Sequence, residues 1–204
     1  MLKKYSISLI IAVVLITPIT VFAIVNWIEN KGRALPVYEG ENHKITNFKL
    51  TNQNGDTVTL QNWKNKIVVA DFFFTHCPLI CPKMTSNLKK VQAAFPDKEN
   101  LQFTSFSVDP VRDSVPQLKV FANRFGITGN WHLLTGDKVA IYNLARKSFA
   151  VDASKGDGGR HDFIHSDKLV LLDADHRIRG YYSGTTDKDV LQLINDIKKL
   201  YNER

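Results

Sequence analysis

Cys77 and Cys81 are the residues of this chain best suited to chemistry, and the sequence contains no other cysteine. Three residues separate them. Side chains at positions i and i+4 of a regular helix lie about 5 to 6 Å apart at Cβ, whereas the Cβ atoms of a relaxed disulfide lie roughly 3.5 to 4.5 Å apart. A metal ion with bonds of about 2.3 Å to each sulfur spans the wider gap. The spacing therefore favours a soft-metal site that can also be oxidised.

Two other uses of the cysteine pair stay open. A structural disulfide is the first, although closing so short a loop removes little conformational entropy from the unfolded chain. Redox chemistry is the second: a thiol-disulfide oxidoreductase or thiol peroxidase uses one cysteine of low pKa to attack and the other to resolve the intermediate.

The cysteines follow an apolar run, residues 67–74 (IVVADFFF), which predicts a central strand buried on both faces. A helix is predicted next, because Pro82 suits a first turn and the following apolar residues have helical spacing: Met84, Leu88, Val91 and Phe95. The cysteines thus lie at a strand-to-helix junction, where backbone N–H groups and the helix dipole favour a thiolate.

The other predicted elements complete a thioredoxin-like α/β fold, a central sheet flanked by helices. Asn54-Gly55 predicts a hairpin. We expect strands at residues 45–50, 57–60, 101–108, 131–134, 163–172 and 177–182, and helices at residues 116–124, 137–147 and 186–201.

The N-terminal segment is predicted to be a membrane anchor. After Lys3 and Lys4, residues 5–28 carry no charge, which is long enough for a membrane-spanning helix with a cytoplasmic N-terminus. A cleaved signal peptide is the alternative, because Val21 and Ala23 suit a cleavage site. We therefore expect an anchor at residues 1–28, a tether at 29–43 and a domain at 44–204, which lies on the outer side of a bacterial plasma membrane.

Composition excludes several classes of function. The net charge is +7, but the basic residues are interspersed with acidic ones along the chain, so no nucleic-acid partner is expected. Two methionines, one of them Met1, exclude a methionine-rich copper shuttle. Any redox or soft-metal function therefore depends on the cysteine pair.

His165 is the candidate for a third metal ligand, because it precedes an apolar strand whose start is expected to face the cysteine helix. Taken alone, a histidine in such a place is more often structural. His161, four residues upstream, is a weaker candidate for a supporting role. His76 adjoins Cys77, but neighbouring side chains of an extended segment point in opposite directions.

Three motifs resemble the Sco/SenC family: residues 75–82 (THCPLICP), 107–113 (SVDPVRD) and 164–166 (IHS). Its members are membrane-anchored, thioredoxin-like copper proteins that help to assemble the binuclear copper site of cytochrome c oxidase. The resemblance covers residues 45–201 and implies that Cys77, Cys81 and His165 bind one copper ion per chain, as Cu(I) or Cu(II). The implied partners are the copper-site subunit of the oxidase, other copper chaperones and thioredoxin-like reductants.

The chain departs from the family pattern in two places. Leu79 stands where the family often has an acidic residue, and Pro116 comes one residue later than usual. Asp109 and Arg112 match the polar motif and are assigned a supporting role, although a helix cap and a surface ion pair explain them equally well. We expect a copper-binding assembly factor rather than an enzyme; the alternative is a membrane-anchored thiol-disulfide oxidoreductase or thiol peroxidase. His165 separates the two functions, because thiol exchange needs no third ligand.

Overall fold

The computed structural model describes residues 2–32, 34–40, 43–151 and 164–203. The chain divides into two compact units, Met1–Ala34 and Leu35–Arg204. The first consists of one helix, α1 (Leu2–Gly32), and its large apolar side chains from Leu9 to Trp27 are exposed wherever they are described. Among the described residues, no helix is both long and apolar enough to cross a membrane. The predicted anchor at residues 1–28 thus rests on the sequence pattern alone.

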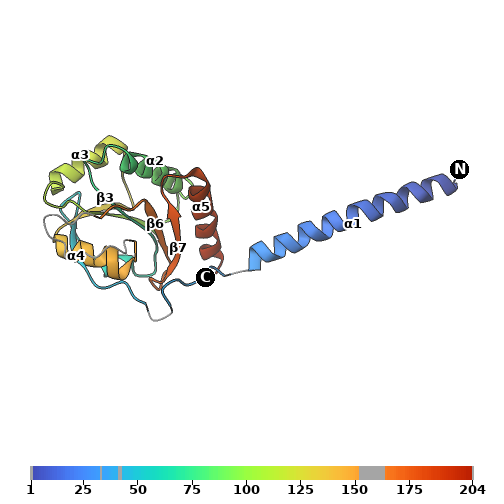
Figure 1. Ribbon diagram of the computed structural model, residues 1–204, viewed down its shortest axis with the longest axis horizontal. Coiled ribbons are helices and arrows are strands. Elements are labelled where there is room, and N and C mark those ends of the chain that lie inside the picture. The colour runs from blue at the N-terminus through green and yellow to red at the C-terminus, as the bar shows by residue number, and fades with distance from the viewer. Residues whose placement is uncertain (1, 33, 41–42, 152–163, 204) are drawn as a thin grey trace. The chain divides into compact units, whose positions relative to one another are not determined.

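The second unit is built on one mixed sheet (Figure 1), which has seven strands within the described residues. Their order across the sheet is β2-β1-β5-β4-β3-β6-β7, with β3, β4 and β5 parallel and the other pairs antiparallel. The strands are β1 (Lys49–Asn52), β2 (Thr57–Thr59), β3 (Ile67–Phe73), β4 (Leu101–Ser107), β5 (Trp131–Thr135), β6 (Lys168–Leu172) and β7 (Ile178–Ser183).

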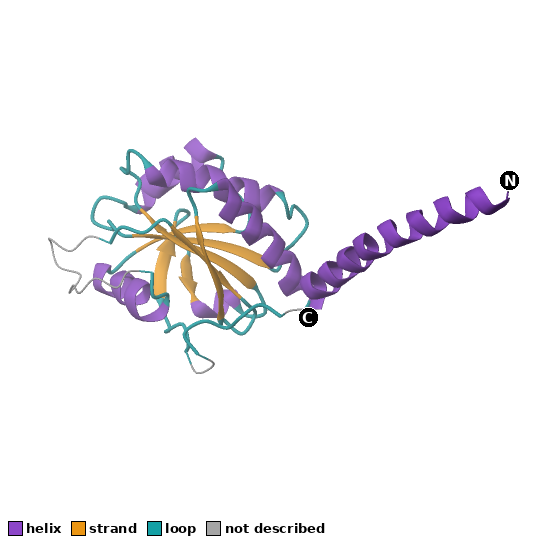
Figure 2. Cartoon of the chain, turned by 45° about the vertical axis from the view of Figure 1, so that its right-hand side comes forward, coloured by secondary structure: helices purple, strands orange, loops and turns teal. Residues whose placement is uncertain are grey.

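Helices cover both faces of the sheet (Figures 1 and 2), with α2, α3 and α5 on one side and α4 on the other. The helical elements of this unit are α2 (Ile80–Ala93), α3 (Val115–Phe125), α4 (Lys138–Asn143), α5 (Asp187–Asn202), a short 3₁₀ helix at Leu60–Trp63 and a π-helix at Leu144–Ser148. This is the α/β thioredoxin-like arrangement that the sequence predicts.

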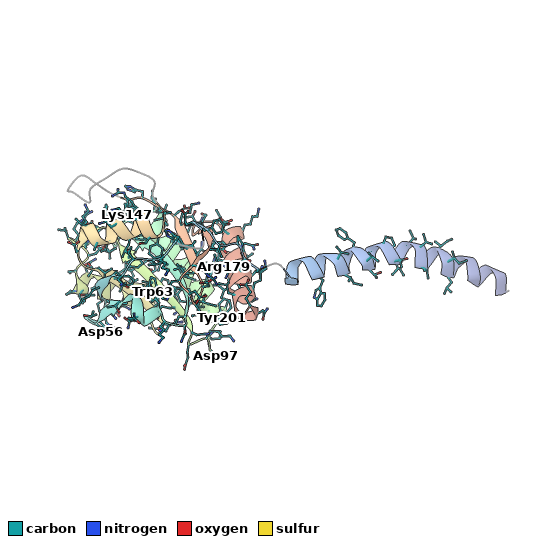
Figure 3. The ribbon with its side chains drawn as sticks, turned by 90° about the horizontal axis from the view of Figure 1, so that it is seen from below. Asp56, Trp63, Asp97, Lys147, Arg179 and Tyr201 are labelled. Atoms are coloured by element: carbon teal, nitrogen blue, oxygen red, sulfur yellow. The ribbon has the colours of Figure 1, made fainter. Side chains whose placement is uncertain are left out.

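Strand β3 shows why the central run is apolar throughout. Its side chains alternate between two cores: Val69 packs with α2, α3 and α5, whereas Val68 packs on the opposite face with Trp63 and α4. Trp63 is fully buried in this second layer (Figure 3). A strand that buries both faces has no position for an exposed polar side chain, so the one acidic residue within it, Asp71, is buried as well.

Several predicted boundaries differ from the observed ones. The hairpin around Asn54-Gly55 is present, but its first strand begins at Lys49 instead of residue 45. The strand predicted from residue 163, which itself lies outside the described residues, begins at Lys168. The helix predicted from residue 137 to 147 is α-helical only to Asn143 and continues as the π-helix. Polar side chains explain the second difference, because Ser166 accepts the N–H of Lys168 instead of joining the ladder.

Candidate metal and thiol site

The cysteines lie where the chain passes from β3 to α2, as predicted. Cys77 is in the loop after Phe73, and Cys81 is the second residue of α2. Because β3 and β4 are parallel, the segments that follow them emerge at the same edge of the sheet, where the N–H of Val108 donates to the carbonyl of Phe73 at 2.9 Å. We call this the cysteine edge.

The two cysteines are not joined by a disulfide. The backbone N–H of Cys81 donates to the Sγ atom of Cys77 at 3.4 Å. Cys77 is 9% exposed and Cys81 is 2% exposed. Both cysteines are therefore buried, Cys77 less completely than Cys81.

The start of α2 favours the thiolate form of Cys77. Burial acts to raise the pKa of this thiol, but hydrogen bonds from the backbone of Cys81, Leu79 and Ile80 and from the Cys81 side chain outweigh it, so the pKa falls below its usual value. N–H groups at a helix N-terminus have no partner within the helix, so they are available to the sulfur.

Cys81 shows the opposite shift. Burial is the largest cause and raises the pKa of this thiol far above its usual value, and the side chains of Cys77 and Asp71 raise it further. The pair therefore consists of an accessible thiol that ionises readily and a buried thiol that holds its proton. Such a pair offers two soft sulfur donors to a metal once both are deprotonated.

Asp71 is a buried acid that the sequence did not identify as part of the site. It lies within β3, is 3% exposed, and accepts a hydrogen bond of 2.5 Å from the hydroxyl of Ser105 on β4. Burial raises the pKa of its carboxyl to about 7, although the bond from Ser105 acts in the opposite direction. The Ser105 oxygen in turn accepts the indole N–H of Trp131 at 2.9 Å.

Asp113 is the second acid that the sequence analysis left without a role. It is fully buried at the cysteine edge and accepts hydrogen bonds from the backbone N–H and the hydroxyl of Thr75 at 3.1 and 2.5 Å. It also accepts the hydroxyl of Ser107 at 2.5 Å. Its place in the SVDPVRD motif was a signal, but the sequence gives no sign that this carboxylate, unlike its neighbour Asp109, turns inward.

Asp109 and Arg112 form an ion pair at the surface of the same loop, with the Arg112 side chain 58% exposed. The simpler interpretation of the two residues predicts this ion pair, and exposed pairs of this kind contribute little to stability. It also predicts a helix cap, which is wrong, because the residue at the cap of α3 is Ser114.

His165 is exposed and lies between the buried Ile164 and the start of β6. Within the part of the chain that the structure describes, no three His, Cys, Asp or Glu side chains are grouped closely enough to hold one metal ion. The structure therefore brings Cys77 and Cys81 together but does not join His165 to them. His76 is exposed, with its Nδ1 atom 3.0 Å from the Thr75 hydroxyl, and His161 lies outside the described residues.

Comparison with known proteins identifies the family. The SCO1 protein homolog of Bacillus subtilis is 33% identical over 160 residues, which are 77% of this chain and 82% of that protein. The structure of BsSco, a member of the Sco family of cytochrome c oxidase assembly proteins in which a disulfide switch was identified, matches with a TM-score of 0.68 and 31% identity. That match covers 82% of this chain and 99% of BsSco.

A third match is the copper-bound structure of ScoI from Bradyrhizobium japonicum, with a TM-score of 0.63, 28% identity, and coverage of 77% of this chain and 99% of that one. The family model described as SCO1/SenC matches residues 37–202, which include both cysteines, Asp113 and His165. This chain therefore belongs to the SCO1/SenC family.

Proposed function

We propose that this protein is a copper chaperone that binds one copper ion and passes it to the copper-site subunit of cytochrome c oxidase. The observation that carries the proposal is the unbridged pair of Cys77 and Cys81 at the start of α2. Thiolate sulfurs are the soft ligands that Cu(I) prefers. The copper-bound ScoI structure, from a member of the same family, supports copper as the metal.

His165 is our proposed third ligand. Strands β3 and β6 are antiparallel, with Asp71 opposite Leu169. Four residues further along this register, beyond the end of the ladder, His165 comes opposite Thr75, two residues before Cys77. A modest closure of this segment would then bring an imidazole nitrogen to the copper, which suits Cu(II) as well as Cu(I).

Transfer of copper requires ligand exchange with a partner at the cysteine edge. Cys77 is 9% exposed and Leu79, between the two cysteines, is 78% exposed. An incoming ligand therefore reaches Cys77 first, and Cys81 releases the metal last. Other copper chaperones would deliver copper at the same edge.

A specific observation also favours thiol-disulfide exchange as a second function. The pKa of Cys77 is lowered and the pKa of Cys81 is raised, which is the asymmetry expected of an attacking and a resolving thiol. The disulfide switch identified in BsSco supports a redox role. A thioredoxin-like reductant would then restore the dithiol.

We further propose that the domain functions on the outer side of a bacterial plasma membrane, held there by residues 1–28 through the tether at 29–43. The support is the basic start of the chain followed by an uncharged segment from Tyr5 to Ile28. Membrane fractionation followed by N-terminal sequencing tests this location. A mature chain that begins at Ile24 would mean that the segment is a cleaved signal peptide.

Copper titration of the reduced, metal-free protein tests the main proposal. We expect one copper ion per chain, with sulfur-to-copper charge-transfer absorption in the Cu(II) form. A stoichiometry near zero, with Cys77 and Cys81 still able to form a disulfide, would reject the copper chaperone and leave thiol-disulfide exchange as the function.

A further inference from the structure

Strand β7 borders the sheet on one side (Figure 1), since β6 is its one strand neighbour among the described residues. A border strand has backbone N–H and C=O groups on its outer side, and these groups can pair with a strand of another molecule. The strand at the opposite border, β2, has three residues and so offers little length for pairing, whereas β7 has six. The fold therefore leaves β7 as the border that needs a cover.

A short segment of the same chain lies against the outer side of β7. We call it the strap and define it as residues 35–38. The N–H of Tyr38 donates to the carbonyl of Ile178, the first residue of β7, at 2.9 Å. The rings of Tyr38 and Tyr181 meet edge to face, with their centroids 5.4 Å apart. The strap thus takes the place that a further strand would have beside β7.

The far end of β7 is closed by a side chain. The N–H of Ser183, the last residue of the strand, donates to the carboxylate of Asp189 on α5 at 2.8 Å. This carboxylate keeps the N–H from pairing with a strand of another molecule. Both ends of β7 are therefore occupied from within the chain, and the stretch from Ile178 to Tyr182 depends on the strap for its cover.

The strap is held mainly at its first residues. Arg179 donates to the carbonyls of Leu35 and Pro36 at 2.6 and 3.2 Å, and Glu203 accepts the N–H of Leu35 at 2.8 Å. The Leu35 side chain is buried in the core that α5 covers, whereas Tyr38 is exposed. A hollow of about 260 Å³ lies between the strap, β7 and α5. A segment held at so few points can detach while the strands stay paired.

The free border of β7 suits a second copy of the same strand. Two copies related by a two-fold axis pair antiparallel, and this pairing lets identical borders match each other. Charged side chains on a border strand are the usual obstacle to such pairing. The one charged residue of β7 is Arg179, which is buried in ion pairs with Asp173 and Glu203. Without the strap, β7 therefore has little charge to prevent association.

We propose that the strap is a releasable cover for β7. While it is bound, it keeps the domain from associating through this border. When it is released, β7 pairs with β7 of a second copy of this chain. The inference goes beyond the proposed function, because neither the cysteines nor copper take part in it.

The test compares two variants of the full-length, reduced protein in detergent micelles. Leu35→Asp places a charge in the core and next to Glu203, so it should detach the strap. Ala34→Asp is the matched control, because it adds the same charge at the neighbouring exposed position. Hydrogen exchange measured by mass spectrometry reports the release. The strap amides should exchange at least about tenfold faster in Leu35→Asp, the effect of losing one to two hydrogen bonds, and at the wild-type rate in Ala34→Asp.

Light scattering then measures the number of chains per micelle as the protein concentration rises. We expect the dimer fraction of Leu35→Asp to increase with concentration, together with slower exchange of the amides of residues 178–182. The wild-type protein and Ala34→Asp should have equal masses at every concentration and no such slowing. Association through the N-terminal segment would affect all three proteins alike, so the difference between them reports on the strap.

Circular dichroism establishes whether Leu35→Asp folds. If it does not, Tyr38→Pro decides the question, because it removes the N–H that binds Ile178 at an exposed position. Its dimer fraction should change in the same direction and by less. A folded Leu35→Asp that keeps wild-type exchange in the strap would show that the strap is not releasable. Release without a dimer, or a dimer that leaves the exchange of residues 178–182 unchanged, would overturn the proposed pairing.

Discussion

Two buried carboxylates at opposite edges of the sheet are stabilised in different ways. At the cysteine edge, Asp113 accepts hydrogen bonds from Thr75 and Ser107, which are neutral donors, and the ring of the exposed His76 lies 3.8 Å from it. At the other edge, directly after β6, Asp173 is paired with the guanidinium groups of Arg177 and Arg179 at 2.9 and 3.0 Å. One carboxylate is therefore held by neutral donors, and the other by charge compensation.

The second cluster, which we call the arginine clasp, consists of Asp173, Arg177, Arg179 and Glu203. Arg179, labelled in Figure 3, is 5% exposed and also contacts Glu203 at 2.8 Å and the carbonyl of Leu35 at 2.6 Å. The clasp thus ties together the first and last parts of the domain and the β6–β7 turn. The clasp therefore joins distant parts of the domain through charged groups, whereas the cysteine edge holds a loop in place through neutral hydroxyl and backbone donors.

The largest expected effect is at the cysteine edge. Cys77→Ser or Cys81→Ser leaves one thiol, which is too few soft ligands to hold copper, so the copper stoichiometry should fall from one to near zero. Atomic absorption after gel filtration measures it. If either variant kept one tightly bound copper, the two-sulfur site would be wrong.

A mutation in the arginine clasp should lower folding stability and leave copper binding unchanged. Arg179→Ala removes the buried cation from Glu203 and Asp173, but Asp173 keeps Arg177, so we expect a loss of roughly 1.5 to 3 kcal/mol of folding stability. Urea denaturation measures the loss, and Lys90→Ala is the control, because the Lys90–Asp187 pair is exposed and should contribute less than about 1 kcal/mol. The folded Arg179→Ala protein should keep the wild-type copper stoichiometry; a lower stoichiometry would show that the two edges are coupled.

The buried carboxyl of Asp71 should make folding stability depend on pH. Burial raises the pKa of this carboxyl from 3.8 to about 7, so the folded state retains a proton that the unfolded state releases between these values. Stability from this residue is complete below about pH 4, falls as the pH rises, and levels off above about pH 7, with a total loss of roughly 4 kcal/mol. In denaturation experiments, the free energy of unfolding of Asp71→Asn should therefore decrease less from pH 4 to 8 than that of the wild-type protein. Equal decreases in the two proteins would contradict the raised pKa that burial gives Asp71.

Much of the fold follows from local patterns. The apolar run at residues 67–74, the Asn54-Gly55 turn and the helical spacing after Pro82 depend on neighbouring residues, and each of these elements is present. The errors arise where a polar side chain interrupts the local pattern. The strand predicted from residue 163 begins only at Lys168, because the hydroxyl of Ser166 accepts the N–H of Lys168.

The site was less predictable than the fold. The cysteine positions follow from one strand-to-helix junction, so the sequence suffices for them. The inward turn of Asp113 does not, since its partner Thr75 is 38 residues away and Asp109, which pairs with the exposed Arg112, belongs to the same motif. Asp71 had a signal of its own: an acidic residue within a strand that is otherwise apolar and buried on both faces must also be buried.

The smallest expected effect concerns His165, which stays a prediction from the sequence. If His165 completes the copper site, His165→Ala leaves two sulfur donors, which suffice for Cu(I) but not for Cu(II), since Cu(II) favours additional nitrogen or oxygen ligands. Cu(II) affinity should fall by a factor on the order of a hundred, while the Cys77–Cys81 pair can still be oxidised to a disulfide.

A histidine beside the arginine clasp offers a matched control for this prediction. His176 lies in the turn beside the clasp, and its positive φ of 62° is one that asparagine tolerates, so His176→Asn removes an imidazole at the opposite edge with little backbone strain. Cu(II) absorption and competition titrations should separate the two variants, with His176→Asn retaining wild-type affinity. Equal Cu(II) binding by His165→Ala and the wild-type protein would exclude His165 as a ligand, and His161, four residues upstream, would then be the next position to replace.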